Sequence, residues 1–82
     1  MSKTTFGSNV KKLRQAHGLT QSYVADALGI SRRAYIDIES GKTLPRTYER
    51  YEMLAMVLHV RISDLWLEDL DFVTETTVTI KR

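Results

Sequence analysis

The sequence predicts an all-α domain of five short helices, followed by a strand-like C-terminal extension. Between residues 5 and 67, apolar side chains recur every three or four positions in short runs, separated by glycine or by hydroxyl residues that suit helix N-caps. From Asp71 onwards the chain is instead rich in β-branched residues, which is typical of a strand. The 82 residues suffice for one domain, placed at residues 1–68, with the extension at residues 69–82.

The first three helices are delimited by glycines and capping residues. The first is predicted over residues 5–17, where a glycine follows as a natural stop. A second, short helix begins after Thr20, whose hydroxyl suits an N-cap, and ends at Gly29. Ser31 is the predicted cap of a third helix that stops at Gly41.

The last two helices follow a loop at residues 42–46, which contains the single proline of the chain. Thr47 suits the N-cap of the fourth helix, and residues 62–66 predict a short fifth helix that closes the core. The side chains expected to face inward are Phe6, Val10, Leu13, His17, Val24, Ala25, Leu28, Ala34, Tyr35, Ile38, Tyr48, Tyr51, Leu54, Ala55, Leu58, Ile62, Leu65 and Trp66.

The extension is a predicted strand without a partner in its own chain. One side of it would be formed by Phe72, Thr74, Thr76, Val78 and Ile80. Because an unpaired strand edge promotes association, we expect it to pair with its copy in a second subunit. A frayed tail is the plainer alternative. A surface on the fourth and fifth helices, around Trp66 and Leu67, is the other dimer interface to consider.

Composition excludes several classes of function. The chain has no cysteine, and His17 and His59 lie too far apart in sequence to indicate a zinc site, so we expect neither metal nor cofactor. No acid pair, nucleophile–base pair or phosphate-cradling glycine run is present, which argues against an enzyme. No apolar run approaches the about 18 residues of a membrane span, and no signal-peptide core is found. We therefore expect no membrane association and a cytoplasmic protein.

The charges are unevenly distributed along the chain. Residues 1–50 contain nine basic and four acidic side chains, whereas residues 51–82 contain three basic and six acidic ones. The net charge of +2 thus hides a basic front half and an acidic back half. This asymmetry is expected of a module that presents one face to a polyanion.

Several spaced positions together carry a resemblance to a known family. They are Leu19-Thr20-Gln21, Ala25, Gly29-Ile30-Ser31, Ile38-Glu39-Ser40-Gly41, Leu54-Ala55 and Ile62-Ser63-Asp64-Leu65. Over residues 6–67 the chain resembles the phage-repressor/Cro-like helix-turn-helix proteins, the XRE family. The resemblance implies a five-helix, lambda-repressor-like domain whose second and third helices form the helix-turn-helix. It also implies a homodimer on a palindromic operator in double-stranded DNA, generally acting as a repressor of transcription.

The resemblance places base-reading residues at the start of the third helix, at Arg32 and Arg33. The planar fork of arginine can donate twice to guanine, which is worth about 1–3 kcal/mol of discrimination per good pair. One turn further on, Asp37 can accept from cytosine N4 or orient an arginine, and Ile36 can touch a thymine methyl. A phosphate contact without sequence reading is the alternative for either arginine.

The resemblance places the DNA-backbone contacts on both sides of the third helix. Gln21, at the start of the second helix, can offer its amide to a phosphate beside the positive helix end; a solvent-exposed glutamine is the alternative. The other implied backbone contacts are Arg14, Lys42, Thr43, Arg46 and Thr47.

Three further residues are expected to support this surface. Glu39 resembles the family's partner for Arg14, which ties the first and third helices and aims the arginine at the DNA backbone; an exposed acid at a helix end is the alternative. Ala25 faces the next helix, where a larger side chain would push the two apart. Gly29 occupies the turn, where a left-handed backbone favours glycine.

The sequence also departs from the family pattern and permits a rival function. His59 stands where relatives often have glycine, and Arg61 where they have a small capping residue, which puts the start of the fifth helix in doubt. The rival is an antitoxin-type interaction protein, which binds a partner toxin and autoregulates its operon. The acidic extension would serve such a partner by β-augmentation.

Overall fold

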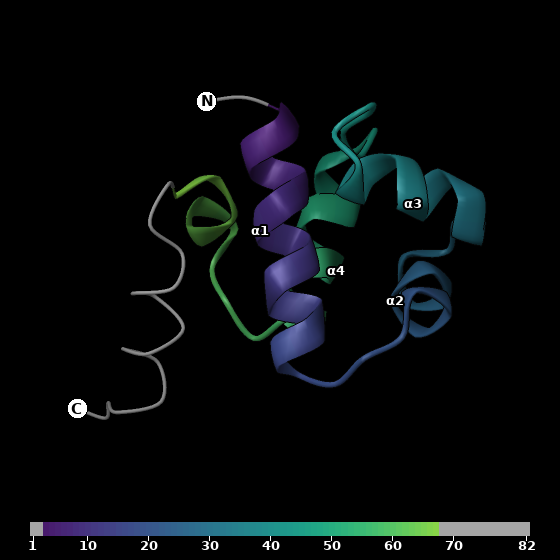
Figure 1. The fold of residues 1–82 in the computed structure, drawn as a ribbon, viewed down its shortest axis with the longest axis horizontal. Helices are drawn as coiled ribbons and strands as arrows, with labels where there is room; N and C mark the ends of the chain where they lie inside the picture. Colours follow the sequence, from purple (N-terminus) through teal and green to yellow (C-terminus); the bar gives the residue numbers. More distant parts are fainter. Residues whose placement is uncertain (1–2, 68–82) are drawn as a thin grey trace.

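The computed structural model describes residues 3–67, which form four α-helices and one 3-10 helix (Figure 1). The elements are α1 (Lys3–Ala16), α2 (Gln21–Leu28), α3 (Arg32–Glu39), α4 (Tyr48–Val57) and η1 (Ile62–Trp66). The all-α fold class is confirmed, but the predicted count of five α-helices is wrong, because η1 takes the place of the fifth. The predicted strand lies outside the described residues, and so do its side chains Phe72, Thr74, Thr76, Val78 and Ile80.

The shortness of η1, which has five residues, explains why it is not an α-helix. Its flanking residues, Arg61 and Leu67, both have extended backbones, with ψ of 156° and 141°. Asp64 bonds back to Arg61 twice: its N–H donates to the Arg61 carbonyl, and its carboxylate accepts from the Arg61 N–H, both at 3.0 Å. Hydrogen bonds between residues three positions apart are those of a 3-10 helix, which is tighter than an α-helix. The five residues between the two extended ends are therefore long enough for a 3-10 helix.

The predicted helix caps are confirmed. Thr20, Ser31 and Thr47 each accept a hydrogen bond at the side-chain oxygen from the backbone N–H three residues later. Gly29 ends α2 with a left-handed φ of 73° and donates its N–H to the last turn. The first helix begins at Lys3, two residues earlier than predicted.

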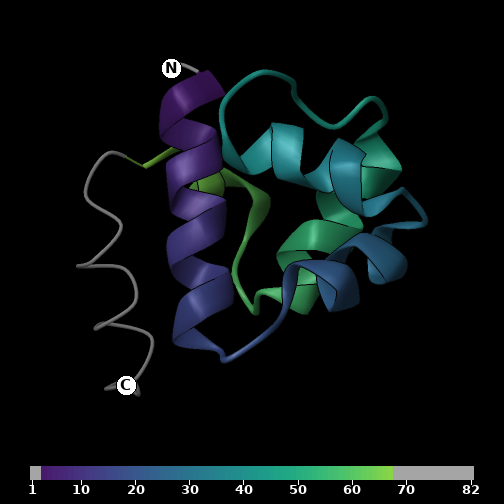
Figure 2. The same cartoon turned by 45° about the vertical axis from the view of Figure 1, so that its right-hand side comes forward.

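The helices enclose one apolar core. Figure 1 shows α1 between η1 on one side and α2 and α3 on the other. In Figure 2, α2 and α3 lie to the right of α1. Helix α2 packs against α3 and α4, while α1 packs against α3 and η1. The buried apolar side chains are Phe6, Val10, Leu13, Val24, Ala25, Leu28, Tyr35, Ile38, Leu54, Ala55, Leu58 and Leu65.

An aromatic cluster closes the core where η1 meets α1 and α4. The Phe6 ring is fully buried, and its centroid lies 4.7 Å from that of Trp66 and 5.6 Å from that of Tyr51. On α1, the amide of Asn9 donates to the carbonyl oxygens of Leu65 in η1 and of Leu67 directly after it. These contacts hold η1 against α1, although η1 is a 3-10 helix and not an α-helix.

Two side chains that were predicted to face inward are exposed. Tyr48 is 67% exposed, because it is the first residue of α4 and lies beyond the buried part of that helix, which centres on Leu54. His17 lies just past the end of α1, where its Nε2 is 2.9 Å from the Leu58 carbonyl oxygen. Within residues 3–67, no helix has the length and apolar character needed to cross a membrane.

Candidate nucleic-acid interface

Helices α2 and α3 form a helix-turn-helix with a turn of three residues. The turn comprises residues 29–31, and Ser31 caps α3 by accepting the Ala34 N–H at 3.1 Å. The cap fixes the first turn of α3, where Arg32 and Arg33 are both exposed. The opposite face of α3 is buried, so its orientation in the domain is set by packing.

The carboxylate of Glu39 is the main anchor of α3. Arg14 donates from Nε to Oε2 at 2.6 Å and from Nη2 to Oε1 at 3.3 Å. Tyr35 donates its hydroxyl to Oε2 at 2.5 Å, and Gln21 donates its amide to Oε1 at 3.1 Å. Because the three donors come from α1, α2 and α3, one carboxylate ties these helices together. The Arg14–Glu39 ion pair that the family resemblance implies is therefore present, with 12% and 4% of the two side chains exposed.

These bonds set the protonation of the cluster. Burial alone would raise the pKa of Glu39, but hydrogen bonds from Arg14, Tyr35 and Gln21 outweigh it and lower that pKa below its ordinary value. The pKa of Arg14 is raised, chiefly by its hydrogen bond to Glu39. Burial, followed by the bond to Glu39, raises the pKa of Tyr35. At neutral pH the cluster therefore holds an ionised acid, a charged arginine and a protonated tyrosine.

Gln21 links the buried anchor to the exposed start of α3. Its amide nitrogen is directed at Glu39, so its amide oxygen is turned outward, where Arg32 Nη2 donates to it at 3.4 Å. The remaining N–H of the amide is available for an outside acceptor. The structure thus brings Arg14, Gln21 and Arg32, all predicted to contact DNA, into one connected network.

The loop after α3 is tied to the end of that helix. The Asp37 carbonyl accepts from the N–H groups of Lys42 at 2.9 Å and Thr43 at 3.3 Å. It also accepts from the Ser40 hydroxyl at 3.0 Å. The exposed side chains of Lys42 and Thr43 are consequently held close to α3.

The other predicted contact residues differ in how accessible they are. Arg46 and Thr47 are exposed, although Thr47 uses its oxygen to cap α4. Ile36 and Asp37 are half-buried on α3. Only 12% of the Arg14 side chain is exposed, and its Nη1 also donates to the Leu19 carbonyl oxygen at 2.9 Å.

The two remaining structural predictions concern Ala25 and Trp66. Ala25 is buried, as expected of a residue that faces the next helix, and its carbonyl oxygen accepts the Ile30 N–H at 3.1 Å. Trp66, named as a dimer contact, is half-buried against Phe6 of its own chain. Its place in a dimer remains a prediction.

Sequence reasoning missed two residues that position this surface. An ideal Cβ on Gly7 would lie 2.4 Å from the Ile38 carbonyl oxygen, so α1 and α3 meet there backbone to backbone. Arg50 supports α2 by donating its Nε to the Leu28 carbonyl oxygen at 3.3 Å. A glycine inside a helical pattern is a signal of close packing that points to Gly7. Nothing in the sequence singles out Arg50.

Comparison with known proteins identifies the family. The helix-turn-helix family profile matches residues 10–65, which is more than half of the chain. The chain belongs to the XRE family of helix-turn-helix proteins. An HTH-type transcriptional regulator of Archaeoglobus fulgidus, described as uncharacterized, is 31% identical over 62 residues, which cover 76% of this chain and 87% of that relative.

Solved structures of two regulators share the fold of this XRE-family protein. The restriction-modification controller protein C.AhdI from Aeromonas hydrophila has a TM-score of 0.68 and 27% identity, covering 77% of this chain and 94% of its own. The clp gene regulator ClgR from Corynebacterium glutamicum has a TM-score of 0.73, covering 96% of this chain and 83% of its own, but its 16% identity shows likeness of fold alone.

The XRE-family protein is therefore a transcriptional regulator with a helix-turn-helix DNA-binding fold. Its family and its named relative are regulators of transcription and not enzymes. Within the part of the chain that the structure describes, no group of three or more histidine or acidic side chains could hold a metal ion.

Proposed function

We propose that this protein is a homodimeric, sequence-specific repressor that binds a palindromic operator in double-stranded DNA. Each subunit would place α3 in the major groove, with Arg32 and Arg33 at base edges and Ile36 and Asp37 one turn further on. The observation that supports this most strongly is that α3 is anchored through Glu39 on its buried side. A rigid helix with exposed arginines at its N-terminal end suits major-groove reading.

The phosphate contacts are proposed for the residues that surround α3. Lys42 and Thr43 are held beside its C-terminal end, and Gln21 offers its remaining amide proton beside the N-terminus of α2. Arg46 and Thr47 extend this contact along the following loop. Arg14 contributes mainly through Glu39, because its Nε, Nη1 and Nη2 all make bonds within the chain.

Dimerisation has two candidate surfaces. The first is the extension at residues 69–82, proposed from its β-branched sequence as a unit separate from the DNA-binding domain at residues 1–68. The second is the predicted surface on α4 and η1 around Trp66 and Leu67. The large apolar side chains that are exposed on α4 or directly after η1 are Tyr48, Met53, Met56 and Leu67. Met56 is 73% exposed and lines a groove between α4 and η1.

Selection of binding sites from random DNA duplexes tests the function as a whole. We expect enrichment of a palindrome whose half-sites lie about one helical turn, roughly 34 Å, apart. The absence of any enriched sequence would overturn specific binding, and an enriched single half-site would overturn the dimer. A promoter bearing the selected palindrome then tests the sign of regulation, since repression requires lower expression when the protein is present.

Light scattering of variants identifies the dimer surface. We expect deletion of residues 70–82 to leave a folded monomer, because the proposed strand pairing is removed. The matched variant is Met56→Glu, which places a charge on the exposed side of α4 and leaves the extension intact. If the truncated chain stays dimeric and Met56→Glu is monomeric, the interface lies on α4 and the extension hypothesis fails.

A further inference from the structure

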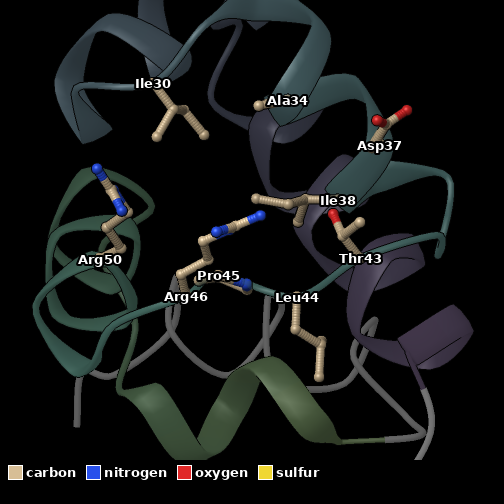
Figure 3. Close-up of a pocket in the computed structure, with 9 residues that line it drawn as sticks. All are labelled: Ile30, Ala34, Asp37, Ile38, Thr43, Leu44, Pro45, Arg46 and Arg50. Carbon is tan, nitrogen blue, oxygen red and sulfur yellow. The ribbon is translucent and has the colours of Figure 1, made fainter.

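A cavity lies between α3 and the loop that follows it (Figure 3). Its volume is about 200 Å³. Ile30, Ala34 and Ile38 form an apolar wall from the turn before α3 and from α3 itself. Across from this wall, Arg46 from the loop and Arg50 from α4 line the opposite side.

The two arginines give the cavity a positive wall. In Figure 3 the guanidinium of Arg46 points toward Ile38, and within residues 3–67 it makes no hydrogen bond or ion pair. Among the residues that the structure describes, Arg50 uses only its Nε, in the bond to the Leu28 carbonyl oxygen, and keeps both terminal nitrogens available. Asp37 also lines the cavity, but Figure 3 shows its carboxylate directed away from the arginines.

We infer that this cavity binds a small monocarboxylate with a compact apolar body. The apolar wall would take the body of the acid, and the guanidinium groups would take its carboxylate, for which the arginine fork is suited in geometry and charge. The volume is also appropriate, since an apolar cavity of about 150 Å³ holds benzene. Benzoate therefore has the size and polarity of the expected ligand.

Such a ligand would act on DNA binding, and this step rests on the proposed function. The cavity lies between α3 and residues 43–46 of the loop, so it adjoins both elements proposed to touch DNA. A bound carboxylate neutralises Arg46, which then has less affinity for a phosphate. By linkage, an acid that binds the free protein better than the DNA complex lowers the affinity for DNA.

The site itself is tested on the free protein, by titrating benzoate into the full chain and following amide chemical shifts by NMR. We expect saturable shifts that are largest at Ile30, Ala34 and Ile38. Arg46→Gln should weaken binding about tenfold, the loss expected for one charge-assisted contact. The matched control is Lys11→Gln, which removes an exposed charge on α1 and should leave the affinity unchanged.

Two comparison probes decide whether both walls contribute. Benzamide lacks the charge and inorganic phosphate lacks the apolar body, so each should bind at least several-fold more weakly than benzoate. Equal binding of either probe, or benzoate shifts spread over the whole surface, would overturn the inference. Ala34→Leu should fill the cavity and abolish binding; if that variant does not fold, the probe comparison still decides. The titration contains no DNA, so its result is independent of the proposed function. Benzoate binding can be absent while the protein binds DNA, and benzoate can bind even if the protein does not bind DNA.

Discussion

Gly7 on α1 touches the carbonyl group of Ile38 on α3. A Cβ at Gly7 would lie 2.4 Å from that oxygen and 2.6 Å from the carbonyl oxygen of Glu39. Both are backbone atoms, which cannot move aside as the end of a flexible side chain can. The crossing therefore sets how closely α3 approaches α1, and it brings Glu39 within reach of Arg14.

Gly7→Ala should destabilise the domain and displace α3. Overpacking of this kind costs about 1–3 kcal/mol, which urea unfolding will measure. Ser8→Ala is the matched control, because Ser8 is the next residue on α1 and is exposed. Equal stability of the two variants would show that the helices separate without strain.

Glu39→Gln should lower stability at neutral pH and make the domain less sensitive to acid. The folded state lowers the pKa of Glu39 below its ordinary value, so its stabilising contribution is present above that ordinary value. The contribution is lost as pH falls through the lowered pKa, because the carboxylate becomes protonated and its ion pair is broken. Removal of one partner of a buried pair costs about 3–5 kcal/mol.

The measurement is the melting temperature of wild type and Glu39→Gln between neutral and strongly acidic pH. We expect the advantage of wild type to shrink as the pH falls below about 4.3, the unperturbed value for glutamate. Glu49→Gln, an exposed acid on α4, is the control and should follow wild type. A gap that stays constant down to the lowest pH would contradict the role of the ionised carboxylate.

Asn9→Ala should loosen η1. The Asn9 amide donates to the carbonyl oxygens of Leu65 at 2.9 Å and Leu67 at 2.6 Å, and its removal leaves both acceptors without this partner. A buried polar group left unsatisfied costs about 1–3 kcal/mol. Trp66 is the single tryptophan of the chain, so its fluorescence reports directly on η1.

Two results would then separate a local effect from a global one. In Asn9→Ala, Trp66 should become more accessible to a quencher at temperatures where the helices remain intact by circular dichroism. The exposed neighbour Lys11→Ala should show neither change. If the tryptophan signal and the helical signal of Asn9→Ala are lost together, η1 is not held separately by this amide.

Arg32→Ala and Arg33→Ala should reduce specificity for the operator, whereas Lys42→Ala should weaken binding to all DNA. A base-reading arginine contributes about 1–3 kcal/mol of discrimination, so its loss affects the operator more than random DNA. Loss of one phosphate contact lowers the salt dependence of binding by about one unit of slope. Titrations of both DNAs at several salt concentrations measure the two effects. If an arginine variant loses affinity for both DNAs equally, that arginine only holds phosphate.

The local features of this protein could be predicted from its amino-acid order. Thr20, Ser31 and Thr47 were identifiable as caps because each bonds to a backbone group three residues away, within one helical turn. The left-handed turn at Gly29 was equally predictable. The pattern of these short-range features was also sufficient to indicate the family.

The contacts between distant segments could not be predicted, because they depend on how the helices pack. Asn9 and Leu65 are separated by 56 positions, and no local pattern reveals that one bonds the other. The contact of Gly7 with Ile38 depends in the same way on the crossing of two helices. The prediction of a fifth α-helix was wrong because the extended backbones of Arg61 and Leu67 leave five residues between them, and these form a 3-10 helix. The prediction of an inward Tyr48 was wrong because helical spacing identifies only a candidate face. Whether other elements cover that face depends on the packing of the whole chain.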